Sequence, residues 1–566
     1  MKRKLMLLMT FLVIGIGLVN AQVSKVTGVV TSEEDGLPIV GASVLVKGTT
    51  VGTVTDLDGN FTLTNVPSSA KTLVVSFIGL QTQELEIKPI MKVVLRSDSE
   101  MLDEVMVVAY GTAKKSSFTG SASTIKAEQI TSGSKESLDK AFSGKMAGVR
   151  VASATGDPGS MGEMNIRGVG SINGSKTPLY VIDGVVMKSD GDMNYYGKSQ
   201  SVLSTLNPDD IESMTVLKDA AAASLYGSRA ANGVVIITTK SGKEGKTRVS
   251  YNGEVGWNKM AVDQYNMMSA QDYIGYVRES VANYYLENGY ASSKDDAYAL
   301  VESEGDVAAF VNDPSGNTNT NWKDEIYRTA VTQNHQVSLN GGNQSTKFYA
   351  GVGYNKSEGI VLGSDFQRIS ARVNVDQKIN NWADFSVKQM IASTTQNGFR
   401  DQNDQAQGLG TSSPLGILFA LDPTAPVKNE DGTYNANAGY GRVSNPHLML
   451  GGKDSDTAME WIQSKMFRSL TNAELGLHFL DKIFFKSIFG YDYIDNKHSE
   501  YWDRDGVNGA SVGGMGSRYT FQNSTLTSSN TLTYTDTFND VHNLSVMAGF
   551  ELENQNLLQI ITIAKN

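Results

Sequence analysis

Nine segments between residue 247 and the C-terminal end alternate apolar and polar side chains, and this pattern constrains the fold most. They are residues 249–257, 336–339, 346–354, 369–375, 384–391, 469–479, 483–493, 522–534 and 542–552. Alternation is the period of a β-strand, and segments of about ten residues with aromatic ends are typical of membrane β-barrels. No interior stretch reaches the roughly 18 apolar residues of a membrane helix. A large soluble β-sandwich is the alternative, but nine such segments favour a barrel.

The connections between these segments differ greatly in length. Residues 340–343 read as a tight Asn/Gly turn, whereas residues 396–459 form a long loop. Residues 262–330 are a long excursion between the first two strands, with helix-like patterns over 271–281 and 295–302. This asymmetry predicts short turns on the periplasmic side and long loops outside.

A compact α+β unit is predicted upstream of the strands. Pro208 suits the first turn of a helix, and an apolar run of strand length follows it. An Ala-rich helical turn closed by Gly227 then leads into a β-branched strand over 234–240. Two short strands precede them, over 165–168 and 178–185, and Asp183-Gly184 forms a hairpin turn in the second.

These sequence segments, in this order, resemble the plug domain of TonB-dependent outer-membrane transporters, and more narrowly the SusC/RagA branch. The resemblance covers residue 22 to about residue 555. It implies a set of plug signature residues: Arg167, Gly168, Asp183, Gly184, Tyr226, Gly227, Arg229, Asn232 and Gly233. Arg167 and Arg229 could pair with carboxylates of a polar barrel wall or be ordinary exposed arginines.

The N-terminus reads as a secretory signal over residues 1–21. A basic start, an apolar run and a small-residue end predict cleavage between Ala21 and Gln22. The chain has no cysteine, which excludes disulfides, thiolate metal sites, a cysteine nucleophile and a lipid anchor on cysteine. The net charge of −11 argues against a general nucleic-acid binder.

Residues 22–97 are predicted to form a small β-sandwich, because short alternating runs are separated by turn signals. The domain resembles the carboxypeptidase-regulatory-like sandwich of SusC-type proteins. Asp56 and Asp58 hint at a calcium loop, but Pro67 stands where the bidentate Glu belongs, so a turn is the better interpretation. No histidine has a Glu three residues later, so no peptidase zinc pair is expected.

Residues 98–122 join the sandwich to the plug. By position the β-prone run there resembles the TonB box, which is expected to pair as an added strand with TonB. Its residues are Asp103, Glu104, Val105, Met106, Val107, Val108, Ala109 and Tyr110. The plug is expected over 123–245, with a helix over 135–147, and a partial barrel over 246–566. Gly509-Ala510-Ser511-Val512-Gly513 matches a nucleophile elbow by chance, since it lies in a loop between barrel strands.

About nine strands are expected, whereas plugged transporters have roughly 22. The segment 557–566 also loses the alternation and lacks a terminal aromatic strand. Because an open edge in lipid leaves backbone groups unpaired, we hypothesise a truncated or frameshifted version of a longer protein.

The fold class expected is therefore mainly β, with a sandwich, an α+β plug and an incomplete transmembrane barrel. The resemblance implies outer-membrane import of an oligosaccharide or peptide under a SusD-like surface lipoprotein, driven by TonB with ExbB and ExbD. No catalytic residue, metal or cofactor is expected. The alternatives are a siderophore or cobalamin receptor of the same fold, and a cell-surface adhesion or scaffold protein.

Overall fold

The computed structural model describes residues 25–565 with internal gaps. The gaps are 33–35, 68–69, 78–79, 96–104, 109–110, 115–120, 132–137, 154–155, 161, 174–175, 188–200, 220–222, 264, 304, 313–317, 399–417, 437–444, 451–458, 481, 507–508 and 540–541. The chain divides into two compact units near residues 106–119, and each is described by itself.

The first unit is a β-sandwich, as the sequence predicts. One sheet has the order β4-β1-β7, and its strands are β1 (Lys25–Ser32), β4 (Asn60–Thr64) and β7 (Ile90–Leu95). The other has the order β3-β2-β5-β6, and its strands are β2 (Ser43–Val46), β3 (Gly52–Val54), β5 (Thr72–Phe77) and β6 (Leu80–Glu86). Alternate residues face inward, so Val26, Val44 and Phe61 are buried between the sheets.

The predicted turn at Asp56 is confirmed. Asp56 Oδ1 accepts hydrogen bonds from the backbone N–H groups of Asp58 (3.0 Å) and Asn60 (2.8 Å). Gly59 takes the positive φ of 72° that closes the turn.

The second unit contains the plug, built on a five-stranded sheet of order β10-β15-β16-β13-β14. Its strands are β10 (Ala122–Lys126), β13 (Leu179–Ile182), β14 (Val185–Val186), β15 (Ile211–Leu217) and β16 (Val234–Thr239). A separate hairpin pairs β11 (Val149–Ser153) with β12 (Gly162–Ile166). Helical pieces are α2 (Ala127–Thr131), α3 (Leu138–Ala141), and the 3₁₀ turns η3 (Val202–Thr205), η4 (Pro208–Asp210) and η5 (Ser224–Ala230).

One of two helical predictions in the plug was wrong in extent. The helix expected over 135–147 ends at Ala141, because Gly144 and Gly148 take positive φ angles of 74° and 73°. The prediction that Gly227 closes a helical turn is confirmed, because Gly227 leaves the helical region with a φ of 68°, and a second turn follows it up to Ala230.

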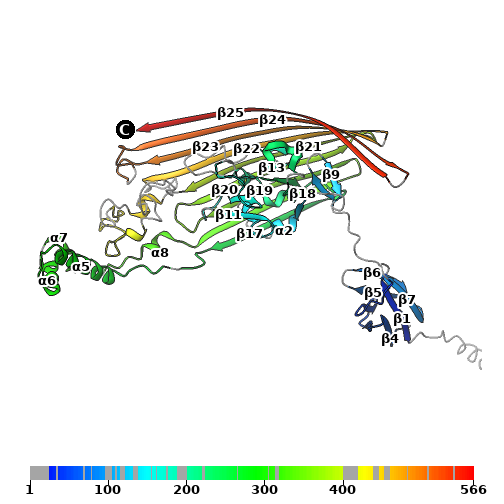
Figure 1. The fold of residues 1–566 in the computed structure, drawn as a ribbon, viewed down its shortest axis with the longest axis horizontal. Coiled ribbons are helices and arrows are strands. Elements are labelled where there is room, and N and C mark those ends of the chain that lie inside the picture. Colours follow the sequence, from blue (N-terminus) through cyan, green and yellow to red (C-terminus); the bar gives the residue numbers. More distant parts are fainter. Residues whose placement is uncertain are drawn as a thin grey trace, which may run out of the picture. The chain divides into compact units, whose positions relative to one another are not determined.

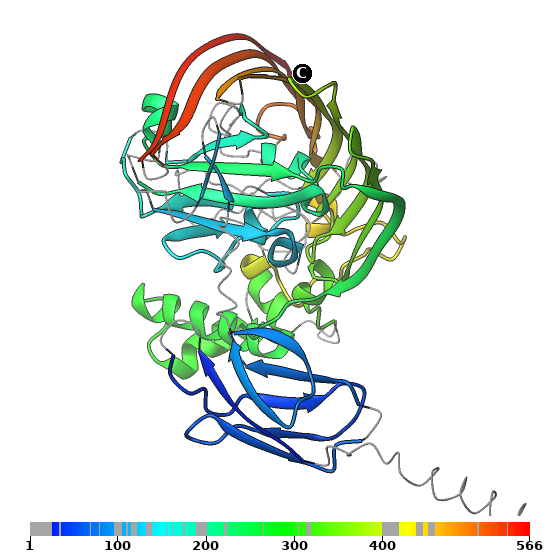
Figure 2. The ribbon, with the colours of Figure 1, turned by 90° about the vertical axis from the view of Figure 1, so that its right-hand side faces the viewer.

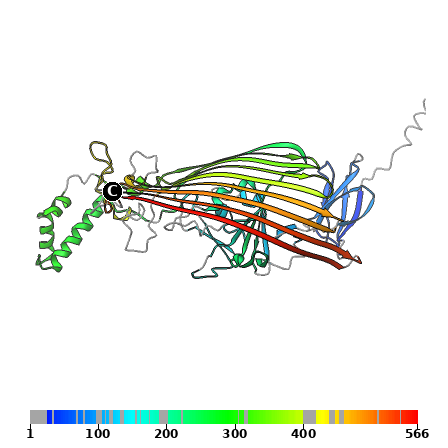
Figure 3. The same cartoon turned by 90° about the horizontal axis from the view of Figure 1, so that it is seen from above.

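A nine-stranded antiparallel sheet follows the plug, with its strands in chain order from β17 to β25 (Figures 1 and 3). The strands are β17 (Gly245–Asn258), β18 (Ala330–Gly342), β19 (Thr346–Glu358), β20 (Asp365–Lys378), β21 (Ala383–Gly398), β22 (Glu460–Phe479), β23 (Ile483–Trp502), β24 (Met515–Phe538) and β25 (His542–Lys565). Every predicted segment lies in one of them. β25 also continues to Lys565, where the sequence pattern had lost its alternation, because its backbone pairs with β24 up to Met515.

The connections are short at one end of this sheet and mostly long at the other. β18 ends at Gly342 and β19 begins at Thr346, whereas residues 259–329 separate β17 from β18. The long connections carry the helices α5 (Ala270–Glu287), α6 (Lys294–Ser303), α7 (Gly305–Val311), α8 (Trp322–Ile326) and α10 (Pro446–Met449), and the turn η6 (Leu418–Ala420). The predicted helices over 271–281 and 295–302 are thereby confirmed.

Two of the long connections share a hydrophobic core. Trp322 and Ile326 pack with Leu421 and Met449, and Trp322 Nε1 donates to the carbonyl of Asp422 at 2.8 Å. Figures 1 and 3 show α5–α7 beyond the strand ends on this side.

The sheet curves, and the plug lies on its concave side (Figure 2). In the part of the chain that is described, no helix is long and apolar enough to cross a membrane.

Candidate functional site

The nine-stranded sheet has an apolar convex face, and its concave face is polar apart from buried apolar side chains of β21–β24, such as Met466 and Ile488, that pack with the plug. On β20, Ile369 and Val373 point outward and are 52% and 48% exposed, while Ser370 and Arg372 are buried on the concave side at 3% each. A soluble sheet buries its apolar face instead, so this arrangement suits an apolar surrounding outside and a polar one inside. The candidate site is therefore the interface between the plug and the concave face.

Three plug carboxylates enter this interface from two local structures. Asp183 stands in a two-residue turn between β13 and β14, where Asp183 and Gly184 both have positive φ (49° and 88°). That geometry is the type I′ turn that Asp-Gly favours, so the predicted hairpin is confirmed. Asp209 and Asp210 belong to η4, which Asn207 caps by accepting from the Asp209 N–H at 3.2 Å.

Polar side chains of β17, β18 and β19 hold η4. Asn207 Nδ2 donates to Gln336 Oε1 at 2.6 Å, and Gln336 Nε2 donates to Asp210 Oδ1 at 2.9 Å. Tyr349 donates its hydroxyl to the same oxygen at 2.7 Å. Asp209 accepts from Asn334 at 2.9 Å and from Asn252 at 3.3 Å.

Two glycines of β19 make room for this turn. A Cβ on Gly351 would lie 2.9 Å from Asp210 Oδ1, and a Cβ on Gly353 would lie 2.4 Å from Asn207 Nδ2. Both distances are too short for a side chain. These glycines were not predicted as site residues, although their spacing of two places them on one face of a strand.

Arg372 lies between the two plug segments. Its Nη1 is 3.6 Å from Asp183 Oδ2, and its Nε is 3.9 Å from Asp210 Oδ2. Lys388 Nζ of β21 adds a hydrogen bond of 3.2 Å to Asp183 Oδ1. Thr239 at the end of β16 also donates to Asp183, from its backbone N–H at 3.0 Å and its hydroxyl at 2.7 Å.

The pKa values of Asp183 and Asp210 are shifted in opposite directions. Burial acts to raise the pKa of Asp183, but Lys388, Arg372 and the Thr239 hydrogen bonds together hold it below the ordinary 3.8. Burial raises the pKa of Asp210 above 3.8, against the opposing effects of Arg372 and Tyr349. Asp183 is thus the stable anion of the pair.

Two buried arginines of the sheet reach the turn η3. Arg368 Nη1 donates to the carbonyl of Ser204 at 3.1 Å, and Arg468 Nη1 lies 3.4 Å from Thr205 Oγ1. Arg468 also forms a bidentate pair with Asp492, with both bonds at 2.9 Å. No sequence pattern predicted this pair, because its partners are brought together only by the register of β22 and β23.

The structure separates the two arginines of the plug signature. Arg229 pairs with two carboxylates of β25, Glu553 at 2.5 Å and Glu551 at 3.5 Å. Arg167 has a positive φ of 56° and an exposed side chain, and it forms no ion pair with a described residue. The wall-pairing interpretation therefore fits Arg229 and not Arg167.

The remaining signature residues shape the backbone of the plug. Gly168, Gly227 and Gly233 have positive φ angles of 95°, 68° and 90°. Tyr226 is buried, and Asn232 Nδ2 donates to the carbonyl of Thr177 at 3.3 Å.

Half of the predicted TonB box lies outside the described residues, as do Ala21 and Gln22 of the predicted cleavage site. The central part of the box, Val105–Val108, is described as strand β8, which pairs with β9 (Gly111–Lys114). Asp103, Glu104, Ala109 and Tyr110 are not described. Within the described residues, no group of three acidic, His or Cys side chains could hold a metal ion.

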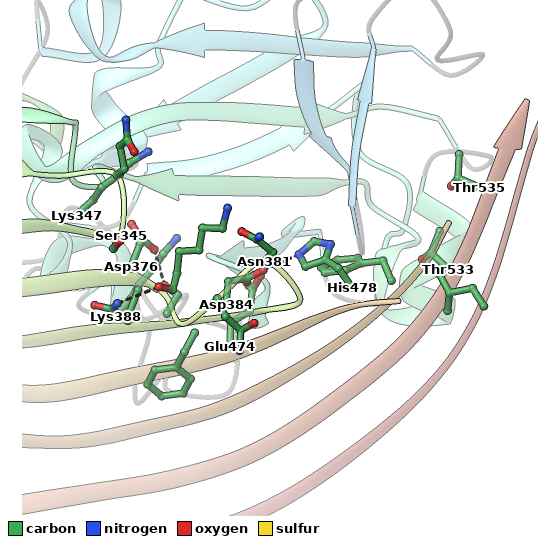
Figure 4. Close-up of a pocket in the computed structure, with 18 of the residues that line it drawn as sticks. Ser345, Lys347, Asp376, Asn381, Asp384, Lys388, Glu474, His478, Thr533 and Thr535 are labelled. Carbon is green, nitrogen blue, oxygen red and sulfur yellow. Dashed lines mark hydrogen bonds and ion pairs between the residues drawn. The ribbon is translucent and has the colours of Figure 1, made fainter. Parts of the chain in front are cut away.

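A cavity of about 730 Å³ opens on the concave face near the short turns. Lys347, Asp376, Asp384, Lys388, Glu474 and His478 are among its lining residues (Figure 4). Lys388 therefore borders the cavity and also binds the plug.

Comparison with known proteins agrees with this architecture. Residues 26–107 match the CarboxypepD_reg-like domain family, and residues 114–234 match the TonB-dependent Receptor Plug Domain family. The TonB-dependent receptor SusC of Bacteroides thetaiotaomicron is 39% identical over 421 residues, covering 74% of this chain and 38% of that protein. TonB-dependent receptor P3 of Formosa agariphila is 31% identical over 554 residues, covering 97% of this chain and 50% of that protein.

A solved structure of the RagAB peptide importer in its open-open state has the same fold. Its TM-score is 0.62 at 23% identity, covering 82% of this chain and 53% of that one. This chain thus spans about half, or less, of the length of the curated relatives it matches. The two domain matches, the similarity to SusC and the plug held in a curved sheet place the chain in the SusC/RagA family of TonB-dependent receptors.

Proposed function

We propose that the protein takes part in TonB-dependent import of an oligosaccharide or peptide across an outer membrane, without covalent chemistry. The observation that carries this proposal is the plug docked on the polar concave face of the sheet. Its contacts there include ion pairs and hydrogen bonds, which can be broken and remade without changing the fold of either part, beside apolar contacts with residues such as Met466 and Ile488. Such an interface suits an element that is moved, and the relatives are named as receptors.

The apolar convex face supports placement of the sheet in a membrane. Outward residues such as Ile369, Val373, Leu532 and Phe467 are 40–52% exposed. Contiguous exposed apolar surface on a soluble protein is uncommon, and lipid would cover it. The short turns would then face the periplasm, and the long loops would face outside.

The segment Asp103–Tyr110 is the proposed contact for TonB. Its central residues, 105–108, already form a short strand, and strand addition joins such a segment to another protein through main-chain hydrogen bonds. TonB would transmit energy from the ExbB and ExbD partners in the inner membrane, and the pull would reach the plug through β10.

A SusD-like lipoprotein is the proposed partner on the outer side. The folded long loops support this assignment, because their shared core around Trp322 gives a preformed surface beyond the strand ends. The substrate would bind between that surface and the plug.

Uptake of labelled neutral oligosaccharides and labelled peptides by host cells tests the proposal. We expect V107P to reduce uptake roughly tenfold or more, because proline removes an N–H that strand pairing needs. S117P in the adjoining linker is the matched control and should leave uptake unchanged. Equal uptake by V107P and wild type, at equal amounts in the outer membrane, would favour an adhesion or scaffold role.

A further inference from the structure

Three exposed basic side chains lie close together on the convex face of the sheet. Lys465 of β22 and Lys497 of β23 are direct partners across their strands. Arg518 of β24 is the direct partner of Ser499, which lies two residues beyond Lys497. On each strand an adjacent residue is buried on the concave side, so these three side chains point outward. They are called the basic cluster here.

Two aromatic pairs border the basic cluster along the strands. On the long-loop side, Trp461 and Tyr501 stack with their ring centroids 6.0 Å apart. On the short-turn side, the ring centroids of Phe467 and Tyr493 lie 6.4 Å apart. Aromatic residues gather where the outer surface of a membrane barrel passes from hydrocarbon to water. The two pairs therefore place the basic cluster at that boundary.

The lengths of the strands give the same depth. A tilted membrane strand needs about 9–11 residues to cross the hydrocarbon core. On β22 and β23, counted from the short turn between them, that length ends at Ser469 and Tyr493. Lys465 and Lys497 each lie four residues farther toward the long loops. Both lysines are thus at the level of lipid headgroups, in the leaflet that the proposed function makes the outer one.

The basic cluster carries more positive charge than its neighbouring acid neutralises. Lys497 Nζ lies 2.8 Å from Asp495 Oδ2. Among the residues that the structure describes, Lys465 and Arg518 form no ion pair, and Arg518 Nε donates to the Ser499 hydroxyl at 3.4 Å. Like charges directly opposite each other on one face of a sheet are destabilising, so a bound anion would stabilise Lys465 beside Lys497.

Lys356 of β19 provides a contrast on the same convex face. Its side chain is 40% exposed, against 48% for Lys497, but its Nζ lies 3.7 Å from Glu358 on its own strand. Asp365 of β20, the direct partner of Glu358, places a second acid there. The excess of positive charge is therefore a property of the basic cluster and not of β19 and β20.

A phosphate-bearing lipid matches both the charge and the surroundings of the basic cluster. Ammonium and guanidinium groups form short, charge-assisted hydrogen bonds with phosphate oxygens, and the Ser499 hydroxyl can donate another. A soluble anion would use these groups alone. A lipid would also cover the adjacent side chain of Phe467, which is 40% exposed.

We propose that the basic cluster binds the phosphate group of a lipid in the outer leaflet, of the lipid A class. Lys465 and Arg518 contact the phosphate oxygens, and Asp495 holds Lys497 between them. The bound phosphate offsets the repulsion between the two lysines and fixes one lipid against β22–β24. This inference rests on the membrane placement in the proposed function and not on transport.

Native mass spectrometry of the full chain, purified from host outer membranes in mild detergent, tests the site. The probes are lipid A with its phosphate groups, the same lipid with the phosphates removed, and inorganic phosphate. We expect the wild type to bind phosphorylated lipid A roughly tenfold or more tightly than dephosphorylated lipid A. K465Q/K497Q/R518Q should lose that difference. Excess inorganic phosphate should not displace the lipid, because it lacks the acyl chains that contact Phe467.

Two further variants separate the site from general charge and from folding. K356Q is the matched control and should bind phosphorylated lipid A like the wild type, because Lys356 already has Glu358. K465R/K497R keeps every positive charge and should also bind like the wild type. Protease susceptibility in urea shows whether K465Q/K497Q/R518Q is folded. If it is not, the comparison of the two lipids on the wild type decides.

The remaining outcomes overturn the site. Equal affinity of the wild type for the two lipids, or equal binding by the wild type and folded K465Q/K497Q/R518Q, means that the basic cluster does not bind the lipid phosphate. An equal loss of binding in K356Q means non-specific attraction, and displacement by inorganic phosphate means a general anion site. Unchanged lipid binding with loss of a co-purified SusD-like lipoprotein assigns the cluster to a protein contact instead.

V107P separates this site from the import function. It should bind phosphorylated lipid A like the wild type whether or not it imports, because residue 107 lies outside the sheet. Absence of the wild type from the outer membrane would overturn the membrane placement, and the lipid site with it.

Discussion

Asp183 Oδ1 of the plug and Lys388 Nζ of the sheet lie 3.2 Å apart, with side chains only 3% and 21% exposed. Their contact joins the plug hairpin, the end of β16 and the wall of the cavity at one point. Because Arg372 and Thr239 also bind Asp183, its carboxylate is the most heavily used acid of the interface.

Removing the charge of Asp183 should therefore loosen the plug. Loss of one partner of a buried ion pair typically costs about 3–5 kcal/mol, and we expect D183N to lower the free energy of plug unfolding by an amount in that range. The measurement is protease susceptibility of the plug in increasing urea, with the protein in detergent micelles. K47A is the control, because Lys47 and Glu84 form an exposed pair in the sandwich. A D183N curve that overlays the wild type would contradict the assignment.

The two plug acids should respond to pH in opposite directions. The pKa of Asp183 is lowered in the folded protein, so its contribution is present above 3.8 and is lost as the pH falls through the folded-state pKa. The pKa of Asp210 is raised, so its ionisation weakens docking as the pH rises from 3.8 through the folded-state pKa.

Substitution of each acid by asparagine isolates these effects. We expect D210N to remove the loss of plug stability just above pH 3.8 and D183N to remove the loss below it. The same urea and protease assay, repeated across the acid range, checks both. If plug stability changed with pH in the same way in both variants, the pKa values of Asp183 and Asp210 would not be shifted in opposite directions.

The close approach of η4 to β19 should make Gly353 intolerant of a side chain. G353A would place its Cβ 2.4 Å from Asn207 Nδ2 and 2.5 Å from Gln336 Oε1. Overpacking of this kind costs about 1–3 kcal/mol, and we expect plug stability to fall by that amount. G256A on β17 is the matched control, because nothing lies within 4 Å of its Cβ. Equal stability of the two variants would mean that η4 can shift away from the wall.

The sequence predicted features that depend on local pattern. The alternation located all nine strands of the sheet, and Asp183-Gly184 predicted its turn because positive φ at both residues is a local requirement. The helix over 135–147 was overestimated, because the apolar spacing continued past Gly144, where the backbone leaves the helical region.

The contacts across the interface could not be predicted, for a physical reason. Arg372 meets Asp183 and Asp210 only because the register from β17 to β21 sets which side chains lie next to one another, across the strands, where the plug docks. Periodicity gives the face of a strand but not its register against distant neighbours. For the same reason, the partners of Arg229 became visible only when β25 lay beside the plug.

Removing the arginine of the buried Arg468–Asp492 pair should lower stability more than removing Arg229, whose ion pairs are more exposed. R468M leaves Asp492 buried without its counter-ion, which should cost about 3–5 kcal/mol of plug and sheet stability. R468M/D492L removes both charges and should recover most of that loss, because two apolar side chains can replace a buried pair. R229M should cost about 1 kcal/mol or less, since the Arg229 side chain is 44% exposed. Protease susceptibility in urea ranks the three variants, and a double variant no more stable than R468M would mean that Thr205 and η3 need the arginine itself.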